Sequence, residues 1–227
     1  MKMYLVIDLD KSLLKIDLFK ETLGKFLIHH PWKIFKVIFL AFGNRALLKK
    51  FIASQINIDW PRLPFNQKVI DLILDYRKEG YEIILATGAT KSFAQGIANH
   101  LGLFDMVLAT NDNVNNIGKN KLNSIMEKVD KEFIYVGDSK KDLPIWRYCK
   151  KAILIGNNIS IQKKLKSSSV EIIDIIEDEK SIIKILFRQL RIYQWSKNIL
   201  LFVPAVASHQ LFTAGVFMNA LQGFIAF

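Results

Sequence analysis

Six short apolar runs, separated by helix-like stretches, set the fold class of residues 1–178. Runs of this length, bounded by turn residues, are typical of buried strands. They are Tyr4–Ile7, Glu82–Ala86, Met106–Ala109, Phe133–Val136, Ala152–Ile155 and Glu171–Ile176. Two intervening stretches predict helices: Asn66–Glu79, capped by Asn66 and ended by Gly80, and Lys91–Leu101, ended by Gly102. Strands that alternate with helices predict an α/β fold with a parallel sheet.

Polar side chains follow three of these runs, where each predicted strand ends. In a parallel sheet, ligands bind beyond the carboxyl ends of the strands, so we expect these side chains to meet there. Lys119 and Lys121 add positive charge at the head of a predicted helix. The residues that follow the runs are Asp8 and Asp10, then Thr87 and Gly88 in "LATGAT", then Asp138 and Asp142 in "YVGDSKKDLPIW".

This residue set suits phosphoryl transfer through an aspartyl phosphate. Two neighbouring carboxylates repel each other unless a cation or a proton is present, and Mg²⁺ prefers oxygen ligands. We predict Asp8 as nucleophile and Asp10 as proton donor, with Asp8, Asp10, Asp138 and Asp142 around Mg²⁺. Thr87 would donate a hydrogen bond to a phosphoryl oxygen, and a lysine would offset charge in the transition state.

The interval between the first two strands, Lys15 to Arg62, predicts two or three helices. "PWKIFKVIFLAFG" fits one of them, with Pro31 in its first turn and Gly43 closing it. Inserted after the first strand, these helices would cover the carboxyl end of the sheet as a lid. The alternative is that this apolar helical segment is simply part of the packed core.

Basic residues are unevenly spread in this chain of net charge +11. From Thr22 to Ile58 there are six basic residues and no acidic one, interleaved with aromatic rings, and Lys180 to Lys197 adds five more basic residues. Lysines among aromatic side chains, without a nucleic-acid-binding motif, favour an anionic membrane over nucleic acid as partner. A solvated helix face is the simpler alternative for either patch.

The last thirty residues, Asn198 to Phe227, contain no charged side chain. This stretch exceeds the roughly 20 apolar residues that span a bilayer, although Pro204 and the polar Ser208 to Gln210 interrupt it. We predict a membrane segment; a buried core helix is the alternative. The basic residues before it place the N-terminal part on the cytoplasmic side of the cell membrane.

In order, "VIDLDKSLL", "ILATGAT", Gly118–Lys121 and "YVGDSKKDLP" resemble the four motifs of the haloacid dehalogenase-like hydrolases. The resemblance implies a Rossmann-like core, a cap inserted after the first motif at about residues 15–62, Mg²⁺ dependence and phosphatase activity. It favours Lys121, with Lys119 in reserve, as the catalytic lysine, and Ser12 and Gly88 as substrate-binding residues.

The family's first motif reads D-x-D-G-T, and Lys11 and Ser12 replace its last two residues here. Serine keeps the hydroxyl, whereas Lys11 removes a flexible glycine and adds a charge near Asp8. Lys11 either contacts the substrate phosphate or points to solvent.

"LRIYQWSKNILLFVPAVASHQL" resembles the opening of the UbiA prenyltransferases, in the branch similar to decaprenyl-phosphate phosphoribosyltransferases. We therefore expect a hydrolase domain at 1–178, a basic linker at 179–197 and the start of a UbiA-like membrane domain at 198–227. The aspartate-rich transferase motifs are missing from this sequence. It is then either part of a longer fusion protein or a hydrolase with a membrane anchor. The substrate would be a phosphorylated small molecule or a polyprenyl-linked phosphosugar.

Overall fold

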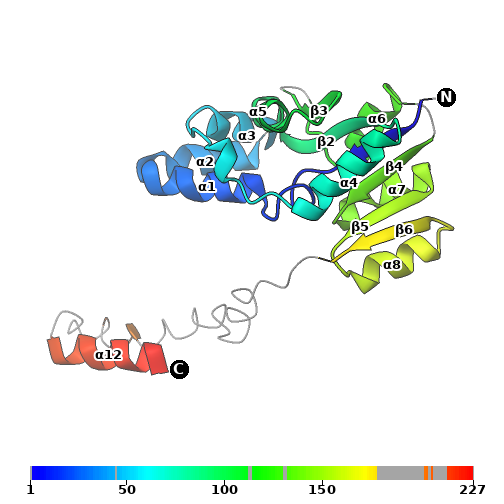
Figure 1. Cartoon of the computed structure of the whole chain (residues 1–227). Coiled ribbons are helices and arrows are strands. Elements are labelled where there is room, and N and C mark those ends of the chain that lie inside the picture. Colours follow the sequence, from blue (N-terminus) through cyan, green and yellow to red (C-terminus); the bar gives the residue numbers. More distant parts are fainter. Residues whose placement is uncertain are drawn as a thin grey trace. The chain divides into compact units, whose positions relative to one another are not determined.

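The computed structural model describes residues 2–43, 45–111, 114–129, 132–177, 202–203, 206 and 214–226. The chain divides into two compact units, Met1–Asp178 and Glu179–Phe227. Each is described by itself below (Figure 1).

The first unit is built on a six-stranded parallel sheet in the order β3-β2-β1-β4-β5-β6 (Figure 1). All six predicted strands are confirmed, and the α/β prediction with them. β2 runs four residues beyond the predicted end because Thr90 pairs with Thr110 after a register shift. The strands are β1 (Tyr4–Ile7), β2 (Glu82–Thr90), β3 (Met106–Thr110), β4 (Phe133–Gly137), β5 (Lys151–Ile155) and β6 (Glu171–Ile176).

Helices cover both faces of this sheet, since successive side chains of a strand point to opposite faces. Leu5 and Ile7 of β1 belong to the core cluster that includes α4 and α5, whereas Tyr4 and Val6 belong to the cluster that includes α6, α7 and α8. The helices are α4 (Gln67–Lys78), α5 (Lys91–Leu101), α6 (Lys119–Met126), α7 (Leu143–Cys149) and α8 (Ile159–Lys166), with 3₁₀ turns η2 (Trp60–Arg62) and η3 (Lys140–Asp142).

The two helices predicted from their end signals are present. α5 ends at Gly102, whose φ of 64° is the left-handed conformation that favours glycine at a helix end. α4 follows Asn66, as predicted, but that side chain makes no capping hydrogen bond within the described structure.

Among the described residues, three α-helices lie between β1 and α4, and we call residues 15–62 the cap. They are α1 (Leu18–His29), α2 (Ile34–Phe42) and α3 (Arg45–Ala53). The segment predicted as one helix from Pro31 begins as a 3₁₀ turn, η1 (Pro31–Lys33), before α2. The cap has its own core of Phe26, Val37, Leu48 and Ile52, separate from the two sheet clusters.

In the second unit the structure describes one helix, α12 (Ala214–Ala226). Among the described residues, no helix is both long enough and apolar enough to cross a bilayer. The basic linker at 179–197 and much of the predicted membrane segment at 198–227 lie outside the described residues, so both stay predictions.

Candidate active site

The end of β1 is the centre of the sheet's carboxyl edge. Ile7 pairs with Leu85 of β2 on one side and with Val136 of β4 on the other. The next residue, Asp8, still donates its backbone N–H to the Val136 carbonyl at 3.0 Å. The Asp8 side chain is therefore held at this edge by the two neighbouring strands, and it is buried, with 6% of its surface exposed.

A tight loop turns the chain away immediately after Asp8. The backbone N–H groups of Leu13 and Leu14 donate to the carbonyls of Asp8 and Leu9. Lys11 has a φ of 58°, a left-handed conformation that favours glycine. Lys11 thus keeps the backbone shape that a glycine would take at this position, at some steric strain. Ser12 is buried, and its hydroxyl has no hydrogen-bond partner among the residues that the structure describes.

Lys121 connects the carboxylates at this edge. It lies in the first turn of α6 and is 4% exposed, and its ammonium donates to Asp8 Oδ1 at 2.6 Å. The same Nζ donates to the Tyr135 hydroxyl at 3.0 Å and reaches Asp142 Oδ1 at 3.5 Å. Lys119, the reserve candidate, is exposed at the start of the same helix. Of the two lysines, Lys121 is the one placed at Asp8.

Asp142 is positioned by the turn that follows β4. Its Oδ2 accepts the backbone N–H of Ser139 at 3.2 Å, and its Oδ1 accepts the Tyr135 hydroxyl at 2.9 Å. A Cβ atom on Gly137 would lie 3.0 Å from Asp142 Oδ2 and 2.7 Å from Tyr135 Cε1. Glycine at this position therefore allows the Asp142 carboxylate to approach the strand end.

Asp8, Asp138 and Asp142 form a cluster of carboxylates. One oxygen from each lies within 4.8 Å of the others. Burial raises the pKa of Asp8 to about 7, an effect that the Asp142 carboxylate adds to and Lys121 opposes. Burial, with the Asp142 charge, also raises the pKa of Asp138 to about 6. Burial alone would lower the pKa of Lys121, but the charges of Asp8 and Asp142 outweigh it and raise that pKa.

These three residues fit a divalent metal ion. They are hard oxygen donors, the type that Mg²⁺ and Ca²⁺ prefer. The ammonium of Lys121 offsets only one of three carboxylate charges, so a bound dication would relieve the remaining repulsion.

Asp10, predicted as a fourth ligand, does not belong to this three-aspartate cluster. Its Oδ1 accepts the backbone N–H of Leu18 at 2.7 Å, at the start of α1. The chain leaves the strand after Ile7, so the alternation that would place Asp8 and Asp10 on one face no longer holds. Burial raises the pKa of Asp10, while the Leu18 N–H opposes that shift.

Thr87 and Gly88 lie on the part of β2 that passes this edge. Thr87 is buried, and its hydroxyl oxygen accepts the Ala89 N–H at 3.0 Å. The Gly88 carbonyl accepts hydrogen bonds from Thr110 at 2.9 Å and from Lys49 at 2.5 Å. Both predicted residues therefore lie beside the neighbouring strand end, and Gly88 is linked to the cap.

Lys49 is a site residue that the sequence analysis missed. It lies on α3 of the cap, and its ammonium also donates to Asn115 Oδ1 at 3.0 Å. Burial lowers the pKa of Lys49, and the nearby Asp10 charge opposes that shift. In the sequence, Lys49 is one of six lysines and arginines between Thr22 and Ile58, and no spacing separates it from the others.

Tyr135 and Asn116 were missed as well. Tyr135 lies within the apolar run of β4, where its hydroxyl gives no periodic signal. The Asn116 amide donates to the carbonyls of Thr87 and Leu108, and so fixes the loop before α6 against the ends of β2 and β3. The asparagine-rich sequence around Asn116 indicates only a loop.

Part of the first unit is similar to a known family. Residues 43–147 match the family model of the haloacid dehalogenase-like hydrolases. Residues 43–147 are therefore similar to a haloacid dehalogenase-like hydrolase domain. The matched range includes Thr87, Lys121, Asp138 and Asp142, and it begins after Asp8 and Asp10.

Several solved structures share the fold of the first unit. A phosphoserine phosphatase in its apo form superposes with a TM-score of 0.53 at 16% identity, covering 82% of this chain and 98% of that one. A phosphoserine phosphohydrolase-like protein from Francisella tularensis gives 0.53 at 16% identity, covering 78% and 96%. A Bordetella pertussis protein of unknown function gives 0.59 at 13% identity, covering 78% and 99%.

Among curated proteins, the chain is similar to the uncharacterized protein y4nM of Sinorhizobium fredii. The two are 34% identical over 226 residues, which is 100% of this chain and 44% of that protein. The chain therefore spans less than half the length of this relative. The resemblance of residues near 190–211 to UbiA prenyltransferases stays a prediction, because it falls mostly outside the described residues.

Proposed function

We propose that the hydrolase domain is a Mg²⁺-dependent phosphomonoesterase that forms an aspartyl phosphate on Asp8. One observation carries this proposal: Asp8, at the end of the central strand, is paired with buried Lys121 at 2.6 Å inside a three-aspartate cluster. A carboxylate attacks phosphorus only where positive charge offsets the charge of the phosphate. The likeness in fold to a phosphoserine phosphatase supports the same chemistry.

In the first step, a carboxylate oxygen of Asp8 attacks phosphorus and the bond from phosphorus to the leaving oxygen breaks. Asp10 gives its proton to that oxygen, and its raised pKa favours the protonated form that this step needs. In the second step, water attacks the phosphorus of the aspartyl phosphate and gives a proton back to Asp10. Inorganic phosphate leaves, and Asp8 is regenerated. Lys121 stays protonated beside Asp8 throughout.

Asp8, Asp138 and Asp142 would hold Mg²⁺, which supplies positive charge for the phosphoryl oxygens. Thr87 would bind a phosphoryl oxygen, and Ser12 and Gly88 would contact the substrate. The lysine of the cap, Lys49, approaches the same edge through Gly88 and offers a further cation for an anionic substrate.

Replacing Asp10 with asparagine should slow hydrolysis according to the leaving group. Alkyl phosphates need a proton on the leaving oxygen, so their turnover should fall by about 10²- to 10⁴-fold. Aryl phosphates whose phenol leaving groups are acidic need this proton less. The rate of their first step should therefore fall little. The amide oxygen of the substituted side chain can still accept the Leu18 N–H, so the start of α1 should persist.

Steady-state rates on a series of phenyl and alkyl phosphates measure this dependence for the Asp10 variant. Asp17→Asn is the matched control, because Asp17 caps the same helix from outside the cluster. An equal loss on good and poor leaving groups would argue against Asp10 as the acid.

Replacing Asp138 with alanine should raise the Mg²⁺ concentration for half-maximal activity by about tenfold or more, because one of three hard ligands is lost. Titrating phosphate release with Mg²⁺ measures this. Asp75→Ala, on the exposed surface of α4, is the control. An unchanged metal dependence in the Asp138 variant would place the ion elsewhere.

For the substrate, we propose an amphiphilic phosphate ester such as a polyprenyl-linked phosphosugar, processed at the cytoplasmic face of the cell membrane. The basic and aromatic cap and the uncharged stretch at 198–227 support it. The test is phosphate release by the full chain from a panel of phosphate esters, with Mg²⁺ and with chelator. We expect turnover that chelator abolishes, with preference for the lipid-linked ester over its water-soluble headgroup.

A second function is favoured by Lys11 and by the length of the relative. Lys11 holds a strained left-handed backbone where the family's first motif has glycine, and the chain covers only 44% of y4nM. The domain would then be a catalytically silent accessory module of a longer membrane protein, such as a UbiA-type transferase. Absence of phosphate release from the whole panel would support this function, provided that Lys11→Gly restores turnover.

A further inference from the structure

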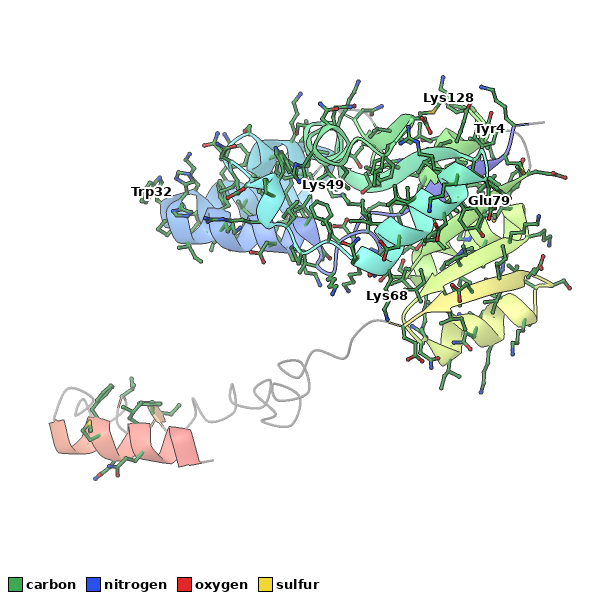
Figure 2. The ribbon with its side chains drawn as sticks, viewed as in Figure 1. Tyr4, Trp32, Lys49, Lys68, Glu79 and Lys128 are labelled. Atoms are coloured by element: carbon green, nitrogen blue, oxygen red, sulfur yellow. The ribbon has the colours of Figure 1, made fainter. Side chains whose placement is uncertain are left out.

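The cap carries several large apolar residues that are exposed, on α1, η1 and α2. Phe35, Phe39 and Phe42 of α2 are 78%, 78% and 90% exposed, and their spacing of four and three residues places them on one helix face. Trp32 and Ile28 extend this set at 70% and 78% exposure. We call these five residues the α2 apolar face. Figure 2 shows Trp32 at the outer end of the cap and Lys49 on its side toward the sheet.

The fold of the cap does not require this face. α2 packs inward through Val37, which is buried against Phe26, Leu48 and Ile52. The rings on the opposite side contribute little to that cluster. Single exposed apolar residues are common on proteins, but a contiguous apolar patch marks an interaction surface.

The sequence segment that carries this face has side-chain charge of one sign. Residues 22–58 contain no aspartate or glutamate, and the basic residues among them include Lys33 directly before α2 and Lys36 within it. Lysines that flank exposed aromatic rings suit an interface in which the rings enter the acyl region and the ammonium groups meet lipid phosphates. Each basic residue near an anionic surface adds about 1 kcal/mol of attraction.

We propose that the α2 apolar face binds the surface of an anionic lipid bilayer. Charge decides against other partners. A second copy would bring together two copies of segment 22–58, which is basic and has no carboxylate side chain, with like-charge repulsion. The chain's own stretch 198–227 is apolar but has no carboxylate to meet the lysines. An anionic bilayer offers both an apolar interior and negative headgroups to a protruding helix. The proposal is independent of the phosphatase activity.

A fluorophore at position 39 tests this surface in the full chain. The single cysteine, Cys149, is buried and burial raises its thiol pKa to about 11, so it reacts poorly at neutral pH. Phe39→Cys can therefore be labelled with an apolar, environment-sensitive dye. Ile159→Cys is the matched control, since Ile159 is 64% exposed on α8. The local readout separates this face from any attachment through residues 179–227.

With vesicles of phosphatidylcholine and phosphatidylglycerol, we expect the emission at position 39 to shift to the blue and that at position 159 to stay unchanged. Vesicles of phosphatidylcholine alone, or high salt, should give a weaker response because the headgroup attraction is absent or screened. Adding Phe35→Ser and Phe42→Ser to the labelled chain should weaken the partitioning of this site by about tenfold per ring. The melting temperature should not fall, because both rings are exposed.

Three results would overturn the proposal. A blue-shifted probe without vesicles, independent of protein concentration, would mean that the chain itself covers the face. A shift that grows with protein concentration in the absence of lipid would mean a second copy. An unshifted probe on vesicles that carry the protein would mean that another part of the chain makes the attachment.

Discussion

Replacing Asp8 with asparagine is expected to abolish turnover, by about 10⁴-fold or more, while the domain stays folded. An amide cannot form the acyl phosphate, so the first covalent step is lost outright. The fold should tolerate the change because burial disfavours the charged form of Asp8, as its raised pKa shows. Lys121 keeps its contacts with Tyr135 and Asp142.

Two measurements check this expectation. Phosphate release gives the rate, and mass spectrometry of the acid-quenched wild type should find a phosphoryl group on the peptide that contains Asp8. Asp71→Asn, an exposed residue of α4, is the matched control and should keep full activity. Turnover that survives in the Asp8 variant would rule out this carboxylate as the nucleophile.

Replacing Lys121 with methionine is expected to damage both activity and stability. The change leaves the buried carboxylates of Asp8 and Asp142 without their ammonium partner. Removing one member of a buried ion pair costs about 3–5 kcal/mol. For a unit of this size that lowers the melting temperature by on the order of 10 °C. Loss of positive charge at the phosphoryl group should lower kcat by about 10²- to 10³-fold.

Thermal unfolding with and without Mg²⁺ tests the electrostatic reason for this loss. Added Mg²⁺ should recover part of the lost stability of the Lys121 variant, because it offsets the same carboxylate charges. Lys119→Met is the matched control: it changes an exposed lysine two residues earlier on the same helix and should have little effect. Equal losses in the two variants would contradict the assignment of Lys121.

The sheet could be predicted from the sequence because buried parallel strands are continuous apolar runs. Tyr4–Ile7 is wholly buried, and its continuous apolar run shows no other hydrophobic pattern that would predict a different element. The ends of the helices could be predicted less well. Met126 shares a helical spacing with buried Ile125 and Val129 but is 43% exposed at the end of α6, whereas Val129, in the following turn, is buried. Helical periodicity could not indicate where the helix would stop.

The candidate site could be predicted only in part, for a different reason. Asp8, Asp138 and Asp142 follow strands, Thr87 lies in the last part of β2 and Lys121 is in the first turn of a helix, so topology alone brings them to one edge. Lys49 reaches that edge only because of how the cap packs. No periodic pattern in the sequence indicates that packing. The position of the Asp10 side chain depends on where the chain leaves the strand. The D-x-D spacing does not indicate where that happens.

The central position of β1 also sets the order in which the site forms during synthesis. Tyr4 pairs with Glu82 of β2 and Phe133 of β4, so the strand that carries Asp8 lacks its second neighbour until β4 is made. At ribosomal rates of about 5–20 residues per second, synthesis of the chain from β1 to β4 takes on the order of ten seconds. Throughout it one edge of β1 stays open to pairing with other chains. Until residues 133–137 emerge, this edge of β1 is a place where the nascent chain can pair with another chain.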